Sequence, residues 1–158
     1  MNSELEGLYQ EVLLDHAKRP RNFGEIANDA AHVHGDNPSC GDEIHLHVRF
    51  GEKGQVEEIT FTGQGCAISQ ASASLMTLKL KGKSRADATG LARAFHELVT
   101  TEIVDPPQAL GDLLVMGGVR NFPQRVKCAM LPWRAFEQAL KGNTDTSRIS
   151  TEEDQPIR

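Results

Sequence analysis

The sequence predicts an α+β fold in which a small antiparallel sheet packs against several helices. Two neighbouring segments alternate apolar and polar side chains across a glycine-containing turn, as the strands of a hairpin do. The rest of the chain has apolar residues at helical spacing, mostly after the hairpin. Strands followed by a run of helices are typical of the α+β class. The 158 residues show no internal repeat, and residues 1–142 are expected to form a single domain.

The N-terminal element is predicted to be a helix over residues 4–17, which Pro20 ends. Residues 44–50 carry apolar side chains at every second position, the pattern of a half-buried strand. A second strand is expected over residues 56–62. Because only the short loop 51–54 separates the two, we expect them to pair in antiparallel fashion.

The second half of the chain is predicted to be helical. A helix of small and apolar residues covers 67–81, and Gly82 ends it. Residues 84–87 resemble a capping box with Asp in place of Glu, so a further helix begins there. A short helix is expected over 105–118, and a last one from 122 to about 141.

Composition excludes several classes of protein. Hydrophobic residues make up 39% and charged residues 25%, which is ordinary for a globular domain, and no apolar run approaches the roughly 20 residues of a membrane span. The acidic N-terminus does not resemble a secretory signal. A net charge of −5 argues against nucleic acid as a partner. Short basic patches at 18–21 and 120–127 suit either a solvated loop or docking to an acidic protein. Residues 143–158 are polar without an apolar period, and we expect them to be disordered.

The three cysteines lie in three separate, short motifs. An odd number of cysteines argues against a disulfide framework and favours reduced thiols in the cytoplasm. A single cysteine is often only a small buried apolar residue. Three thiolates together with one carboxylate, however, complete a four-coordinate site for a soft metal. The candidate ligands are Cys40, Asp42, Cys66 and Cys128.

Each thiol has neighbours that favour its deprotonated form. Cys66 begins a predicted helix, where unpaired amides and the helix dipole stabilise negative charge. Cys128 follows Arg125 and Lys127, whose positive charges favour a thiolate. Cys40 lies in a turn-forming segment and stands two residues before Asp42, which places both on one side of an extended chain.

Histidines are the competing metal ligands. His32 and His34 form one pair at i and i+2, and His45 and His47 form another, so either could chelate a metal. The second pair occupies the polar side of a predicted strand, where solvent exposure explains it. We favour an interpretation without metal for both pairs, and the sequence assigns them no other role.

Three blocks of the sequence resemble the IscU/NifU-type scaffold superfamily, and most closely its SufU branch. The blocks are Gly-Asp-Asn-Pro-Ser-Cys-Gly-Asp at 35–42, Gly-Gln-Gly-Cys-Ala-Ile-Ser at 63–69 and Phe-Pro-Gln-Arg-Val-Lys-Cys at 122–128, and the likeness extends over residues 5–141. IscU-type scaffolds place His before the third cysteine, whereas this chain has Lys127 there, as SufU-like proteins do. The long spacer over 85–118 is also similar to that branch.

The resemblance implies a SufE/IscU-like fold and zinc held by Cys40, Asp42, Cys66 and Cys128. It also implies that Cys40 accepts persulfide sulfur from a SufS-like cysteine desulfurase, with Arg125 as a contact to that enzyme. The sulfur would pass to downstream Suf scaffold proteins for iron–sulfur cluster biogenesis. The main alternative is a scaffold that holds a transient [2Fe-2S] cluster on the same residues. The third alternative is a non-enzymatic interaction module in which zinc only holds the ends of helices and strands together.

Overall fold

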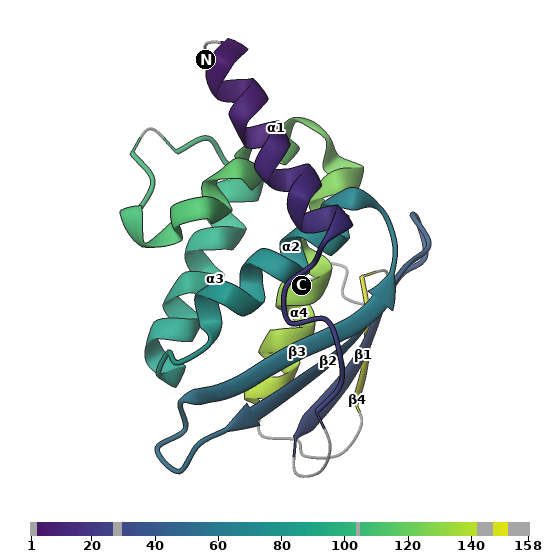
Figure 1. Ribbon diagram of the computed structural model, residues 1–158, viewed down its shortest axis with the longest axis vertical. Coiled ribbons are helices and arrows are strands. Elements are labelled where there is room, and N and C mark those ends of the chain that lie inside the picture. The colour runs from purple at the N-terminus through teal and green to yellow at the C-terminus, as the bar shows by residue number, and fades with distance from the viewer. Residues whose placement is uncertain (1–2, 27–29, 104, 142–146, 152–158) are drawn as a thin grey trace.

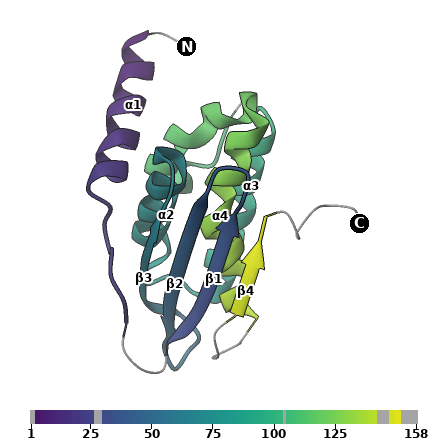
Figure 2. The same ribbon diagram turned by 90° about the vertical axis from the view of Figure 1, so that its right-hand side faces the viewer.

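The computed structural model describes residues 3–26, 30–103, 105–141 and 147–151. The elements follow in the order α1 (Ser3–Lys18), β1 (Ala31–Asn37), β2 (Asp42–Phe50), β3 (Val56–Gln64), α2 (Ala67–Leu80), α3 (Arg85–Thr100), η1 (Gln108–Asn121), α4 (Pro123–Leu140) and β4 (Ser147–Ser150). Helices gather over one face of a sheet, as Figures 1 and 2 show. The predicted α+β class is therefore confirmed.

Within the described residues the sheet has four strands in the order β3-β2-β1-β4. The predicted hairpin is confirmed, since β2 and β3 pair in antiparallel register with Val48 opposite Ile59. β1 continues the antiparallel pairing on the other side of β2. The sheet nevertheless differs from the expected purely antiparallel one, because β4 runs parallel to β1 along its outer edge.

Two of the strands have weak sequence signals. The inward residues of β1 are Ala31, Val33, Gly35 and Asn37, of which only Val33 belongs to a type enriched in strands. β4 lies in the stretch 143–158 where disorder is expected, and residues 143–146 and 152–158 lie outside the described part of the chain. A Cβ atom on Gly35 would lie 3.1 Å from Leu131 Cδ1, 3.2 Å from Ile44 Cγ2 and 3.3 Å from Ile149 Cδ1, so a larger residue would crowd all three. A glycine on β1 thus makes room for a side chain of β4.

The predicted helices are confirmed with small changes at their ends. Ser84 caps α3, since its hydroxyl accepts a hydrogen bond from the backbone N–H of Asp87 at 3.1 Å. The short helix predicted over 105–118 is a 3₁₀ helix that continues to Asn121 and is interrupted at Gly111. Gly111 has a φ of 51°, a left-handed conformation that glycine adopts without steric cost.

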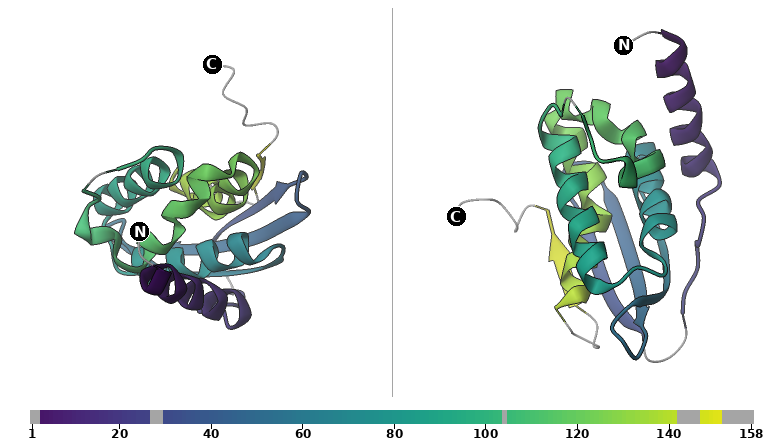
Figure 3. Two further views of the ribbon diagram at one scale, coloured as in Figure 1. Left: turned by 90° about the horizontal axis from the view of Figure 1, so that it is seen from above. Right: turned by 90° about the vertical axis from the view of Figure 1, so that its left-hand side faces the viewer.

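The core lies between the sheet and the helices and takes buried apolar residues from β1, β2, β3, α2, α3, η1 and α4. Figure 3 includes a view of the helices from the side away from the sheet. Trp133 of α4 is fully buried and stacks on Phe95 of α3 with ring centroids 4.6 Å apart. Its indole N–H donates to the Ser72 hydroxyl at 3.2 Å, and that hydroxyl donates to the Ala129 carbonyl at 2.6 Å. Full burial of a large apolar side chain contributes roughly 1.5–3 kcal/mol. These contacts fix α2 against α4, and with them the positions of Cys66 and Cys128.

No described helix combines the length and the apolar character needed to cross a membrane.

Candidate metal centre

The four predicted metal ligands lie in four different parts of the chain that the fold brings close together. Cys40 lies in the turn between β1 and β2, and Asp42 is the first residue of β2. Cys66 is the N-cap of α2, and Cys128 lies in the second turn of α4. The donor atoms of Cys40, Asp42 and Cys128 all lie within 4.8 Å of one another. The Cys66 thiol adjoins this group through a hydrogen bond with the Cys128 thiol. We refer to these four residues as the thiol site.

The turn that carries Cys40 depends on a glycine. Gly41 has a φ of 70°, and its left-handed conformation reverses the chain between β1 and β2. The backbone N–H of Cys40 donates to the Asn37 carbonyl at 3.2 Å and closes the turn. Cys40 stays half-buried, whereas Asp42 and Cys128 are buried. Among the three clustered ligand residues only Cys40 is half-buried, and Cys66 beside them is half-buried as well.

The buried carboxylate of Asp42 is held by hydrogen bonds to both of its oxygens. Oδ1 accepts from the backbone N–H of Cys66 at 2.8 Å and from the Ser69 hydroxyl at 3.3 Å, both at the start of α2. Oδ2 accepts from the Asn37 amide at 3.1 Å. Hydrogen bonds of this kind orient a metal-binding carboxylate before the metal arrives. A helix N-terminus also favours its negative charge.

Gly65, between β3 and α2, lies so close to Asp42 that a residue with a side chain would not fit there. A Cβ atom on Gly65 would lie 2.5 Å from the Asp42 Oδ1 atom and 2.7 Å from the Ser69 hydroxyl oxygen. Both distances are shorter than any van der Waals contact. The glycine before Cys66 thus allows the α2 N-terminus to reach the carboxylate.

Asn37 is a functional residue that the sequence interpretation missed. Its side chain is fully buried, and its amide nitrogen lies 3.1 Å from the Asp42 Oδ2 atom and 3.5 Å from the Cys128 sulfur. Its amide oxygen accepts a hydrogen bond from the Thr151 hydroxyl at 2.8 Å. The available signal was its place three residues before Cys40, at the end of a strand whose odd-numbered residues point inward.

The Cys66 and Cys128 thiols have opposite acidities. The pKa of Cys66 is lowered to about 6, chiefly by the hydrogen bond from the Cys128 thiol and further by the backbone N–H groups of Ser69 and Ile68. The pKa of Cys128 is raised, because its thiol donates to Cys66, because it is buried, and because Asp42 lies beside it. In the metal-free chain these opposite directions favour a proton on Cys128 over one on Cys66. The raised pKa of Cys128 runs against the effect expected from its basic neighbours.

Arg125 lies in the first turn of α4 and faces the thiols. Its pKa is raised by electrostatic interaction with Cys66 first and with Cys128 second, and its guanidinium also donates to Cys66. The sequence associated its charge with Cys128, but the interaction with Cys66 is the stronger one. Arg125 is exposed, so the same side chain adjoins the thiols and the protein surface.

An apolar pocket of about 750 Å³ opens beside the thiol site. Cys66 and Arg125 lie at its margin, and it is lined by side chains of α1, α2, η1 and α4, including Leu13, Ile68, Val115, Val119 and Phe122. Phe122 is 61% exposed. This pocket was not predicted, because its lining combines residues of α1, α2 and the η1–α4 region, which only the fold brings together.

Three sulfur donors and one carboxylate oxygen fit the ligand preferences of zinc, and the same set can hold an iron–sulfur cluster. The carboxylate is already oriented, and the Cys66 thiol has the low pKa that favours metal binding. The proton on Cys128 would be released when a metal binds. The residues present therefore fit a tetrahedral metal.

Comparison with known proteins gives concordant relatives. Residues 8–141 match the family model described as the NifU-like N-terminal domain. The chain is 40% identical to the iron–sulfur cluster assembly scaffold protein IscU of Streptococcus pyogenes, over 94% of this chain and 92% of that protein. It is 41% identical to the zinc-dependent sulfurtransferase SufU of Bacillus subtilis, over 88% and 93% respectively. The crystal structure of FiSufU from Fervidobacterium islandicum superposes with a TM-score of 0.77 and 34% identity, over 88% of this chain and 99% of that one.

Proposed function

The chain belongs to the family of NifU-like N-terminal domains, whose relatives include iron–sulfur cluster assembly scaffolds and SufU, and from this premise we propose that it is a zinc-dependent sulfur acceptor. It would take persulfide sulfur from a SufS-type cysteine desulfurase for iron–sulfur cluster biogenesis. One observation carries the proposal: Lys127, and not a histidine, stands before the third cysteine, beside a site where the donor atoms of Cys40, Asp42 and Cys128 cluster and Cys66 adjoins them. A protonated lysine amine is a poor metal ligand.

The cofactor we propose is zinc, held by Cys40, Asp42, Cys66 and Cys128. Zinc has no redox chemistry of its own, so when bound it keeps thiolates deprotonated and protects them from oxidation. Asn37 and the α2 N-terminus orient the carboxylate of Asp42. Cys66 and Cys128 are fixed by packed helices.

Cys40 is the proposed sulfur acceptor. It is half-buried and belongs to a turn, which can move more easily than a residue within a helix. In the transfer, the Cys40 thiolate attacks the outer sulfur of the enzyme's persulfide. A sulfur–sulfur bond forms at Cys40, the sulfur–sulfur bond of the enzyme breaks, and the enzyme's cysteine leaves as a thiolate. One sulfur atom moves, and no external oxidant or reductant is needed.

The proposed partners are the cysteine desulfurase, which supplies the sulfur, and downstream Suf scaffold proteins, which receive it. Arg125 is exposed beside the thiols and is the proposed contact to the desulfurase. The cytoplasm is the proposed compartment, because its reducing conditions keep the three free cysteines in the thiol form.

The test is a desulfurase assay with cysteine as substrate and alanine as the measured product. Zinc-loaded protein is expected to stimulate alanine release, and zinc-loaded Cys40→Ala is expected not to. Arg125→Ala should reduce the stimulation, whereas Arg93→Ala, an exposed arginine of α3, should not. Normal stimulation by Cys40→Ala would refute the proposed role of this cysteine.

The second candidate is a scaffold for a [2Fe-2S] cluster, which the 40% identical Streptococcus pyogenes relative favours by its name. Metal analysis of freshly purified protein and anaerobic reconstitution with iron and sulfide separate the two functions. The zinc proposal predicts one tightly bound zinc and no stable visible absorbance. A stable cluster on the wild-type protein, with Lys127 in place, would support the scaffold instead.

A further inference from the structure

The sheet face that points away from the helices carries a second cluster of metal-binding side chains. Residues of β1 and β2 alternate between the core and this outer face, and four of the chain's six histidines point outward from the two strands. They are His32, His34, His45 and His47. No described helix lies over this face, as Figure 2 shows. The cluster therefore lies on the outer side of β1 and β2, whereas Asp42 of the thiol site is buried on the core side of β2.

The histidines form two cross-strand pairs. His34 lies directly opposite His45, and their rings stack with centroids 4.4 Å apart and an interplanar angle of 5°. His32 lies opposite His47 in the same way, at 4.6 Å and 9°. A hydrogen bond of 3.1 Å between His32 Nε2 and His45 Nδ1 joins the two pairs. Antiparallel pairing thus brings the two histidines of β1 next to the two histidines of β2.

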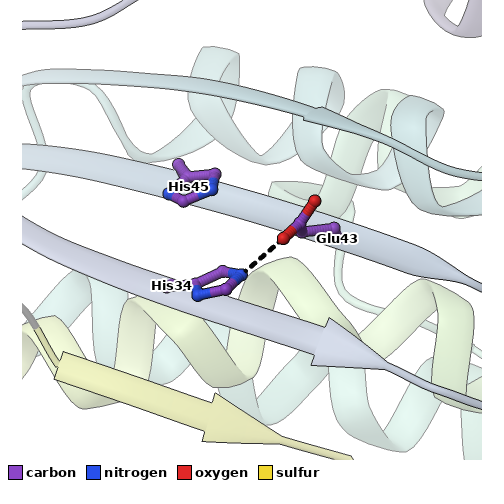
Figure 4. Close-up of side chains that lie close together, drawn as sticks. All are labelled: His34, Glu43 and His45. Carbon is purple, nitrogen blue, oxygen red and sulfur yellow. Dashed lines mark hydrogen bonds and ion pairs between the residues drawn. The ribbon is translucent and has the colours of Figure 1, made fainter.

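Glu43 adds a carboxylate to this cluster. Its Oε2 atom lies 2.8 Å from His34 Nε2, and both side chains stand beside His45 (Figure 4). One donor atom from each of His34, Glu43 and His45 lies within 4.8 Å of the other two. The side chain of Glu43 is 41% exposed and that of His34 is 18% exposed, so an ion can reach them from solvent.

We propose that His34, Glu43 and His45 form a second metal site, one that binds a divalent transition-metal ion such as Zn²⁺. Two imidazole nitrogens and a carboxylate oxygen are a common ligand set for zinc, and imidazole also suits copper and nickel. The three donors must approach one another only slightly to surround an ion with bonds of about 2.0–2.2 Å. Water would complete the coordination.

The remaining histidines support the three ligands. His32 is a positioning residue: when Nδ1–H of His45 donates to Nε2 of His32, the lone pair of His45 Nε2 is left for a metal. Burial, followed by the neighbouring histidines, lowers the pKa values of His32 and His47 and keeps these rings neutral. His47 is only 9% exposed, so the expectation that solvent exposure accounts for this pair is wrong for it. Within the described residues its buried Nε2 atom has no hydrogen-bond partner, so the polar groups of the cluster are not all satisfied internally.

The experiment uses the untagged full chain, loaded with one equivalent of zinc at the thiol site and then titrated with further Zn²⁺. Calorimetry measures the stoichiometry, and NMR follows the ring protons of the histidines. We expect a second bound equivalent, with shifts of the His34 and His45 ring signals. His34→Ala and Glu43→Gln should each lose this second equivalent, and His32→Ala should weaken it by roughly 10–100-fold. His96→Ala, which changes an exposed histidine of α3, is the matched control and should bind like the wild type.

Two results would overturn the proposal. One is a wild-type chain whose histidine ring signals do not shift after the first equivalent of zinc. The other is a second equivalent that folded His34→Ala and Glu43→Gln both retain. Circular dichroism verifies the folding of each variant, and the wild-type spectra decide the question if a variant does not fold. The Cys40→Ala chain separates the two sites, because it should lose affinity at the thiol site and keep the histidine site.

Discussion

Asn37 connects three parts of the molecule through one side chain. Its amide nitrogen approaches Asp42 and Cys128, and its amide oxygen accepts a hydrogen bond from Thr151, next to β4. All of these groups are buried. A buried polar group that loses its partner costs the full free energy of its desolvation. Asn37 therefore contributes both to the stability of the fold and to the orientation of the metal ligands.

Replacing this residue tests that role. Asn37→Ala removes the hydrogen bonds that this amide makes to the buried carboxylate of Asp42 and to the hydroxyl of Thr151, so we expect the free energy of unfolding to fall by about 1–3 kcal/mol. Zinc affinity should fall by roughly 10–100-fold, as it does when a partner of a metal ligand is removed. Urea unfolding and competition with a chromophoric zinc chelator measure the two effects. Asn121→Ala, at an exposed position, is the control, and equal behaviour of the two variants would contradict the assigned role.

His16 gives a prediction about pH. Its side chain is 5% exposed, lies 2.7 Å from the Ser74 hydroxyl, and has a pKa lowered from 6.5 chiefly by burial. Below pH 6.5 the unfolded chain takes up a proton that the folded chain resists, so stability is fully present above that pH and is lost as the pH falls. His32 and His47 also have lowered pKa values and act in the same direction.

We therefore expect the wild type to unfold at a lower urea concentration at about pH 5.5 than at about pH 7.5. His16→Gln should reduce this difference without removing it, since His32 and His47, whose pKa values are also lowered, remain. His96→Gln changes an exposed histidine and should keep the full difference. An undiminished pH dependence in His16→Gln would show that burial of His16 does not lower its pKa.

At the scale of elements, the junction between β3 and α2 brings a helix N-terminus onto the metal site. Gly65→Ala places a Cβ atom 2.5 Å from the Asp42 Oδ1 atom, and the carboxylate is buried and cannot move away freely. We expect this variant to bind zinc roughly tenfold more weakly or worse, measured by the same chelator competition. Gly90→Ala is the matched control, because nothing lies within 4 Å of its added atom. As a glycine in a helix, it should instead gain about 0.4–1 kcal/mol in stability.

The predictability of each element followed from the strength of its local pattern. β2 could be predicted, because Ile44, Leu46 and Val48 alternate with polar residues. β1 was missed, because Gly35 and Asn37 take inward positions that the local pattern does not favour. β4 was missed, because it is short and is placed by pairing with β1, which lies far away along the chain. Long-range packing of this kind leaves no local pattern in the sequence.

At the scale of the whole molecule, one sheet separates two sets of metal-binding groups. The four predicted thiol-site residues could be named from their motifs, because turns and helix starts favour exposed or charged sulfur. Their unequal acidities could not be predicted, since the proton on Cys128 depends on Asp42 and Cys66, which only the fold brings beside it. Nor could the histidine cluster, which requires the register that sets His34 opposite His45.

The most direct test of the central claim is to map persulfide sulfur on each cysteine by mass spectrometry. The zinc-loaded chain is incubated with a cysteine desulfurase and cysteine, the remaining thiols are blocked, and the peptides are analysed. We predict the added sulfur atom on Cys40, with Cys66 and Cys128 unmodified. Sulfur on Cys66 or Cys128 while Cys40 stays unmodified, or no added sulfur on any of the three, would contradict the account.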